Sequence, residues 1–531
     1  MIGKRKGECP MKRLIGLLLI LALVLTGCAF PKNWDGYTAY PDMEYRRPDI
    51  TKLEAARDAG CAAAADAMTL QELENRIWEY YDLYNSFYTN YNLAYIKYCT
   101  DMSDLYWQEE YGYCDGYAAQ ADAGLDALYR ALAASPYRER LEGEDYFGAD
   151  FFDAYEGESL WDETFLAYLD AEADLQNRYY DLRESAKSVA YYSRDFFAQY
   201  APEMGQVFLE LVQLRQEMAA YLGYGSYPEF AYDFYYSRDY TPKEAIAYFE
   251  AVGKAMPSLY RRLVAEPEPE ACTPSDAMHY LRQAAQAMGG SIAEAFSLLS
   301  SRQLHHILPG ENKFDISFEV YLDSYREPFI FIDPEGTVYD KLTLSHEFGH
   351  FVNDYLCGGS YAGTDIAEIH SQAMEYLTLC YSEESQALTD MKLADSICVY
   401  VEQSAYALFE HQVYSLTGDQ LTLENIEALY TRIGMDFGFE SREWDYRDYV
   451  LLTHLFTYPM YMASYVASND VAFQIYQKEL AHSGAGLKLY EEILTSQDSY
   501  LIAFTQKYGL KNPFDPGRVP EICQTLDPLF S

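Results

Sequence analysis

The sequence predicts a mainly α-helical protein with one small β-sheet, and three observations support this prediction. Apolar and aromatic residues recur at intervals of three and four over long stretches between residues 69 and 265, and the pattern resumes after Gly359. Only residues 314–332 show the alternation that is typical of strands. Half of the 531 residues are apolar, so the chain can bury one large core or two lobes.

The chain is expected to have four parts: a leader at 1–27, a tether and the start of the fold at 28–68, an N-terminal helical lobe at 69–270 and a C-terminal lobe at 271–531. The tether is predicted because residues 29 to about 50 are rich in Pro, Asp and Tyr without periodicity. The Pro- and Glu-rich stretch 266–270 between the lobes is expected to be a solvated connection.

The leader has the features of a secretory signal peptide. Five basic residues precede an uninterrupted apolar run, Leu14–Leu25, which is too short to span a bilayer comfortably. The run leads into Leu25-Thr26-Gly27-Cys28, which resembles a bacterial lipobox and predicts cleavage before Cys28 and a lipid anchor on its sulfur. An uncleaved anchor helix is the alternative. Either way, we expect the protein outside the cytoplasm, attached to the bacterial cell membrane.

Acidic residues greatly outnumber basic ones, which argues against nucleic acid as a partner. The formal net charge is −44, and it becomes −48 when residues 1–27, with five basic groups and one glutamate, are removed. Such a surface repels polyanions and anionic lipid and steers basic or neutral peptides towards the protein. The ten cysteines form no CxxC zinc pattern, and their positions fix no disulfide pairing.

Two strands are predicted directly before one central helix. Residues 314–322 alternate between apolar and polar side chains, and Pro328–Ile332 forms a second short apolar run. Pro334-Glu335-Gly336 then predicts a turn into the helix. The edge of this sheet is either a binding edge for an extended peptide or an ordinary sheet packed on the helices, and the pattern alone does not separate the two.

The helix after this turn carries His346-Glu347-Phe348-Gly349-His350, an HExxH motif. Two histidines four residues apart lie on the same helical face, so both imidazoles can reach one metal ion. Glu347 lies about 100° further round the helix, close enough to touch a metal-bound water without being a ligand. The motif therefore predicts a zinc site with its own base, and two surface histidines on a helix are the alternative.

A catalytic zinc site needs a third protein ligand, and Glu368 is the best candidate. It follows His350 by eighteen residues, near the start of the next helix, after Gly358-Gly359 has allowed the chain to turn. The alternative is a capping box formed by Asp365 and Glu368. A metzincin is excluded, because that class needs glycine and histidine where Asn353 and Leu356 stand.

Three segments resemble the thimet oligopeptidase and oligoendopeptidase F family of zinc metallopeptidases. Pro328–Asp333 with Gly336, followed by Thr343–His350, is similar to the strand, turn and zinc helix of that family. Ala367–Glu375 is similar to its second motif. The resemblance makes Glu368 the third ligand of one Zn²⁺ ion and Glu375 the acid that orients a zinc histidine. It also implies a two-lobed helical fold around a deep central channel that admits short unfolded peptides.

His454 and the segment 458–465 resemble the part of that family in which a histidine and tyrosines hydrogen-bond the substrate carbonyl and the tetrahedral oxyanion. The resemblance assigns this role to four residues, His454, Tyr458, Tyr461 and Tyr465. Phenols suit it, because they are neutral donors at pH 7. The alternative is a packed aromatic stripe, in which Pro459 breaks the helix between the tyrosines.

These features together predict a zinc-dependent oligoendopeptidase, a protease that hydrolyses internal bonds of short unfolded peptides outside the cytoplasm. The expected partners are peptide substrates and, through the lipid on Cys28, the membrane. Two alternatives stay open: a zinc aminopeptidase, and a peptide-binding lipoprotein without catalysis. The intact Glu347 argues against the second, because a binder needs no base beside the metal.

Overall fold

The computed structural model describes residues 38–527, apart from the short segments 67–68, 144–145, 187–188, 190–192, 266–268, 360–361, 384–385 and 442–443. The predicted signal peptide and Cys28 lie outside the described residues. Among the helices that are described, none combines the length and the apolar character needed to cross a membrane.

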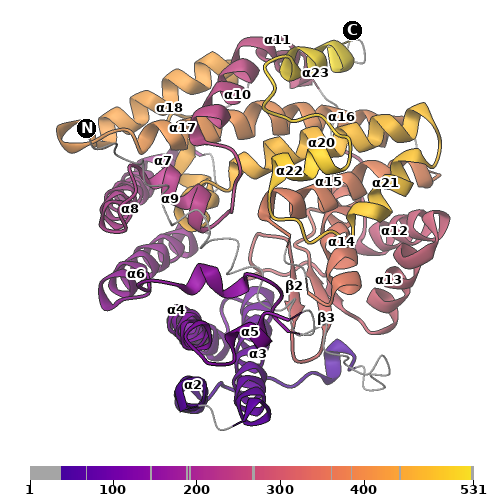
Figure 1. Ribbon diagram of the computed structural model, residues 1–531. Coiled ribbons are helices and arrows are strands. Elements are labelled where there is room, and N and C mark those ends of the chain that lie inside the picture. Colours follow the sequence, from indigo (N-terminus) through magenta and orange to yellow (C-terminus); the bar gives the residue numbers. More distant parts are fainter. Residues whose placement is uncertain are drawn as a thin grey trace, which may run out of the picture.

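Three long helices and their neighbours form a small N-terminal core, drawn in indigo in Figure 1. They are α2 (Ile50–Asp66), α3 (Leu70–Thr100) and α4 (Leu105–Ala133), followed by α5 (Arg138–Leu141) and η3 (Phe151–Tyr155). Thr69 caps α3 by accepting the backbone N–H of Glu72. Leu73, Ile77 and Tyr80 are buried along α3 at intervals of three and four, as the sequence predicted.

A much larger core unites the rest of the chain. Its first part consists of α6 (Glu163–Ala186), α7 (Arg194–Gln199), α8 (Ala201–Tyr221), α9 (Tyr227–Phe234), α10 (Pro242–Ala255), α11 (Pro257–Tyr260), η4 (Arg261–Ala265), α12 (Pro274–Met288) and α13 (Gly290–Ser301). Capping boxes at Thr241 and Thr273 begin α10 and α12, each followed by a proline in the first turn. This core extends across both predicted lobes.

The sheet is small and lies beside α14, as predicted. Its order is β1 (His305–His306), β3 (Glu327–Phe331), β2 (Phe318–Leu322), with β1 parallel and β2 antiparallel to β3. All five residues of the central strand β3 are buried. The strand order makes β1 and β2 the two edge strands, and α14 packs against both β2 and β3. The two predicted strands are confirmed, although β2 begins four residues later than the alternation. The two residues of β1 are too few to give a sequence pattern.

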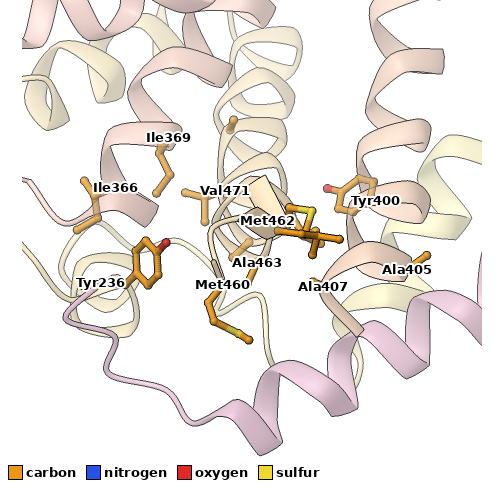
Figure 2. Packing of buried hydrophobic residues seen from close by; sticks show 14 of the residues in the cluster. Tyr236, Ile366, Ile369, Tyr400, Ala405, Ala407, Met460, Met462, Ala463 and Val471 are labelled. Atoms are coloured by element: carbon orange, nitrogen blue, oxygen red, sulfur yellow. The ribbon is translucent and has the colours of Figure 1, made fainter. Parts of the chain in front are cut away.

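Three helices meet at the centre of the large core: α14 (Tyr339–Cys357), α15 (Thr364–Tyr381) and α20 (Met462–Ala481). In Figure 2, Ile369 of α15 lies beside Val471 of α20. Gly349 is where α14 crosses α15, because a Cβ added there would lie 2.5 Å from the carbonyl oxygen of His370. Only glycine permits this approach of the two backbones.

The remaining segments surround this centre (Figure 1, orange and yellow). They are α16 (Gln386–Cys398), the π-helical turn η5 (Val399–Gln403), α17 (Ser404–Val413), η6 (Gly418–Gln420), α18 (Leu423–Phe437), η7 (Phe439–Ser441), η8 (Asp448–Leu451), α19 (Thr453–Thr457), α21 (Ala485–Ile493), α22 (Leu501–Lys507) and α23 (Arg518–Leu526). The mainly helical fold class with a small sheet is thus confirmed.

Residues 40–48 pack on the body of the protein, whereas the sequence predicted a tether as far as about residue 50. Tyr40 begins η2 (Tyr40–Asp42), and its ring lies 4.2 Å from that of Phe329, centroid to centroid. Arg47 pairs with Glu110 of α4, with Nη2 2.5 Å from Oε1. The partners lie far away in the sequence, so local composition could not reveal these contacts.

Candidate active site

The two histidines of the HExxH motif lie on one face of α14, with their ring centroids 5.2 Å apart. The turn at Gly358 and Gly359, both with positive φ, brings α15 back alongside α14. As a result, Oε2 of Glu368 lies 3.4 Å from Nε2 of His346. Possible ligand atoms of His346, His350 and Glu368 all lie within 4.8 Å of one another. The three predicted ligands are therefore brought together.

The capping-box interpretation of Glu368 is wrong. The N-cap of α15 is Gly363, which makes no side-chain cap, and Glu368 lies in the second turn. Asp365, the other member of the proposed box, accepts hydrogen bonds from Tyr240 at 2.9 Å and Ser464 at 2.5 Å instead. Glu368 is thus free of any capping role and faces His346.

Glu375 lies two turns after Glu368 on α15 and contacts the far side of the His346 ring. Its Oε1 is 2.8 Å from Nδ1 of His346, so Nδ1 donates and Nε2 is left as the ligand atom. Its other oxygen lies 2.7 Å from Nζ of Lys392, on α16. The sequence indicated Glu375 but not Lys392, which stands in no motif and comes from a separate helix.

The protonation of this cluster reflects burial and charge. Burial raises the pKa of Glu347 to about 7, although the positive charge of His346 opposes this effect. Burial lowers the pKa of His346, but the hydrogen bond to Glu375 and the nearby carboxylates outweigh it and raise the pKa to about 9. Burial and the charge of His346 together hold the pKa of His350 well below its ordinary value. Two imidazoles and a carboxylate, among further acids, suit a zinc ion.

The turn between α19 and α20 places the predicted oxyanion residues next to this cluster. Nε2 of His454 lies 3.2 Å from the hydroxyl of Tyr465, and the Tyr461 hydroxyl donates to Oε1 of Glu368 at 2.5 Å. Tyr461 therefore contacts the candidate ligand itself, a contact that the sequence did not suggest. Tyr458 lies further out, with its ring centroid 6.2 Å from that of Tyr461 and 46% of the residue exposed.

Buried groups from distant segments hold this turn in place. Pro459 breaks the helix, as predicted, and its carbonyl accepts the Tyr236 hydroxyl at 2.6 Å. Met460 adopts a left-handed φ of 67°, which costs energy in a residue with a Cβ. Arg238 donates to the carbonyl of Met460 at 3.0 Å, and the backbone N–H of Met460 donates to Glu410 at 2.9 Å. Tyr236, Arg238 and Glu410 belong to no sequence motif, and sequence reasoning missed them.

Comparison with known proteins identifies similar folds. Residues 40–159 match the family described as the Peptidase M3 N-terminal domain. The structure is similar to Pz peptidase A with an inhibitor, with a TM-score of 0.80 at 20% identity over 92% of this chain and 98% of that one. It is also similar to a protein described as oligoendopeptidase F from Bacillus anthracis, with a TM-score of 0.76 at 20% identity over 93% and 98%.

A third similar structure is oligoendopeptidase F from Enterococcus faecium, with a TM-score of 0.55 at 16% identity over 90% of this chain and 96% of that one. No curated protein matches the sequence. The resemblance to the oligoendopeptidase F family is confirmed at the level of the fold. Residues 40–159 therefore match the Peptidase M3 N-terminal domain, and the protein as a whole has the fold of the Pz peptidase A and oligoendopeptidase F structures.

Proposed function

We propose that this protein is a zinc-dependent oligoendopeptidase that hydrolyses internal bonds of short unfolded peptides. One observation carries the proposal: the ligand atoms of His346 and His350 on α14 and of Glu368 on α15 lie within 4.8 Å of one another, and α14 also presents Glu347. Glu347 is buried and has no part in that ligand set. A metal site with an adjacent base is the arrangement required for metal-assisted hydrolysis.

His346, His350 and Glu368 would hold a zinc ion, which when bound would supply a Lewis acid that lowers the pKa of the attacking water. Glu347 takes the proton of that water as attack on the peptide carbonyl begins, and it returns the proton to the leaving amine. Glu375 holds Nδ1 of His346 and thereby keeps Nε2 turned towards the metal. Tyr461 fixes Glu368 through its hydroxyl.

Tyr465 and His454 are the proposed donors to the developing oxyanion. Burial raises the pKa of the Tyr465 phenol well above its ordinary value and lowers that of His454 to about 4, so both are neutral at pH 7. Neutral donors that are held in place stabilise an oxyanion without first losing a strong ion pair. Tyr458, which is partly exposed, is proposed to contact substrate at the edge of this group.

A blocked peptide separates this function from its alternatives. The soluble form that begins at Ala29 is mixed with an internally quenched peptide of about ten residues whose N-terminus is acetylated. We expect internal cleavage that a zinc chelator stops and added zinc restores. Cleavage only after the acetyl group is omitted would support the aminopeptidase, and binding without cleavage would support the peptide-capture protein.

The location is a second proposal, which rests on the lipobox-like sequence before Cys28. We propose that a diacylglycerol on Cys28 attaches the protein to the outer face of the bacterial cell membrane, with peptides and not nucleic acid as its partners. Cys28→Ser is expected to move the protein from the membrane fraction to the soluble fraction or to block its processing. Cys9→Ser is the matched control and should change neither mass nor fraction. The lipid anchor would be contradicted by a Cys28→Ser protein that stays in the membrane fraction and has the same mass as the processed wild type, apart from the substitution.

A further inference from the structure

We propose that Lys392 is a positioning residue for the metal site, acting through Glu375 on His346. The inference rests on the proposed function, because it takes His346 as a metal ligand. Nζ of Lys392 lies 2.7 Å from one oxygen of Glu375, and the other oxygen lies 2.8 Å from Nδ1 of His346. The three side chains thus form a continuous chain of contacts from α16 to the candidate metal ligand.

Lys392 is buried to an extent that is unusual for lysine, with 1% of the residue exposed. An ammonium group in such a place is costly unless it is paired. Its partners are Glu375, then Asp395 at 2.9 Å, and the ring of Tyr376, whose centroid lies 5.0 Å away. Asp395 is one turn along the same helix and is 35% exposed at its side chain, so Glu375 is the partner in the interior.

The charges of the site explain why a cation is required there. Glu347, Glu368 and Glu375 bring three carboxylates into one buried region, whereas a zinc ion compensates only two negative charges. Lys392 supplies the third positive charge, on the side of Glu375 that faces away from His346. A zinc ion and the ammonium of Lys392 would together offset the charges of these three carboxylates, which lowers the cost of burying them.

Lys392 also restricts the orientation of Glu375. With one oxygen held by Lys392, the Glu375 carboxylate cannot turn, so its second oxygen stays on Nδ1 of His346. This contact determines which ring nitrogen carries the proton and leaves Nε2 available to the metal. Without the lysine, Glu375 keeps its place only by its bond to His346, and the ligand loses its fixed direction.

The test is the zinc dissociation constant of the soluble form, measured by competition with a chromophoric chelator. Lys392→Met keeps most of the side-chain volume without the charge, and we expect it to raise the Kd about 10- to 100-fold, the range for outer partners of metal ligands. Lys392→Arg should restore most of the affinity. Lys313→Met is the matched control: Lys313 is also buried, but its ammonium donates to backbone carbonyls of Leu308 and Ile332, so the Kd should stay unchanged.

A second measurement separates positioning from general damage to the fold. In a Glu375→Gln background, Lys392→Met should add little further loss of zinc affinity, because its effect passes through Glu375. Lys392→Gln is the fallback if the methionine variant does not fold, since it removes the charge and shortens the side chain while it keeps a polar group there, and the same rise in Kd is expected. If the wild type and Lys392→Met bind zinc equally well, this inference alone is overturned. A wild type that binds no zinc would overturn the proposed function, and this inference with it.

Discussion

Glu347→Gln is expected to lower kcat/KM for peptide hydrolysis about a thousandfold while zinc stays bound. This loss corresponds to an activation free energy that is higher by about 4 kcal/mol. Glutamine has nearly the same shape but cannot accept the proton of the attacking water. The three proposed ligands are unchanged, so metal content should equal that of the wild type. The measurement is kcat/KM on the quenched peptide together with zinc per protein from elemental analysis. Full activity of a zinc-loaded Glu347→Gln protein would remove Glu347 as the base.

Glu347→Asp is the matched control for this prediction. It keeps the carboxylate and shortens its reach by one methylene, so we expect activity between that of the wild type and that of the glutamine variant. The pH profile provides a second check. Burial raises the pKa of Glu347 to about 7 without metal, and a bound dication lowers it. In the wild type kcat/KM should therefore rise with pH along an acid limb below pH 7, and this limb should be absent in Glu347→Gln.

Glu368→Ala is expected to lose zinc, with a Kd raised by more than about a hundredfold, because a direct ligand counts for more than an outer partner. Glu368 has no capping role that the alanine would disturb, since the N-cap of α15 is Gly363 and Glu368 lies in the second turn. The change also frees the Tyr461 hydroxyl from its acceptor. Zinc content after dialysis and the Kd from chelator competition measure the effect.

Asp365→Asn provides the control on the same helix. Asp365 is buried and binds Tyr240 and Ser464, so its loss should lower the thermal unfolding temperature and leave the zinc Kd nearly unchanged. The two variants should therefore give opposite results, with metal loss for Glu368 and loss of stability for Asp365. Unchanged zinc content in Glu368→Ala would contradict the assignment of Glu368 as a ligand.

The sequence revealed those parts of the site that depend on local spacing. His346, Glu347 and His350 follow from the geometry of one helix, and the two-turn interval from Glu368 to Glu375 follows from that of the next. Helical spacing is a short-range property, so a single sequence suffices to show it. The family resemblance added the segment around His454 and Tyr465, which spacing alone would have left as an aromatic stripe.

The residues that sequence reasoning missed act over long range. Lys392 and Glu410 reach the site from other helices and Arg238 from the loop between α9 and α10, and none of the three belongs to a motif. Their side chains are buried ionisable groups, which in a sequence look the same as exposed ones. The bond from Tyr461 to Glu368 was missed for a similar reason, because it joins positions 93 residues apart. Which charged residues fold inward is decided by tertiary packing and not by local pattern.

The crossing of α14 and α15 at Gly349 bears on how such proteins diverge. There the two helices touch through main-chain atoms, with His370 and Ser371 directly against the glycine. The separation of the two ligand-bearing helices is therefore set by atoms that every amino acid possesses, and not by the bulk of interchangeable side chains. The surrounding core can drift through many substitutions without moving the ligands apart, which is consistent with a shared fold at only about a fifth sequence identity.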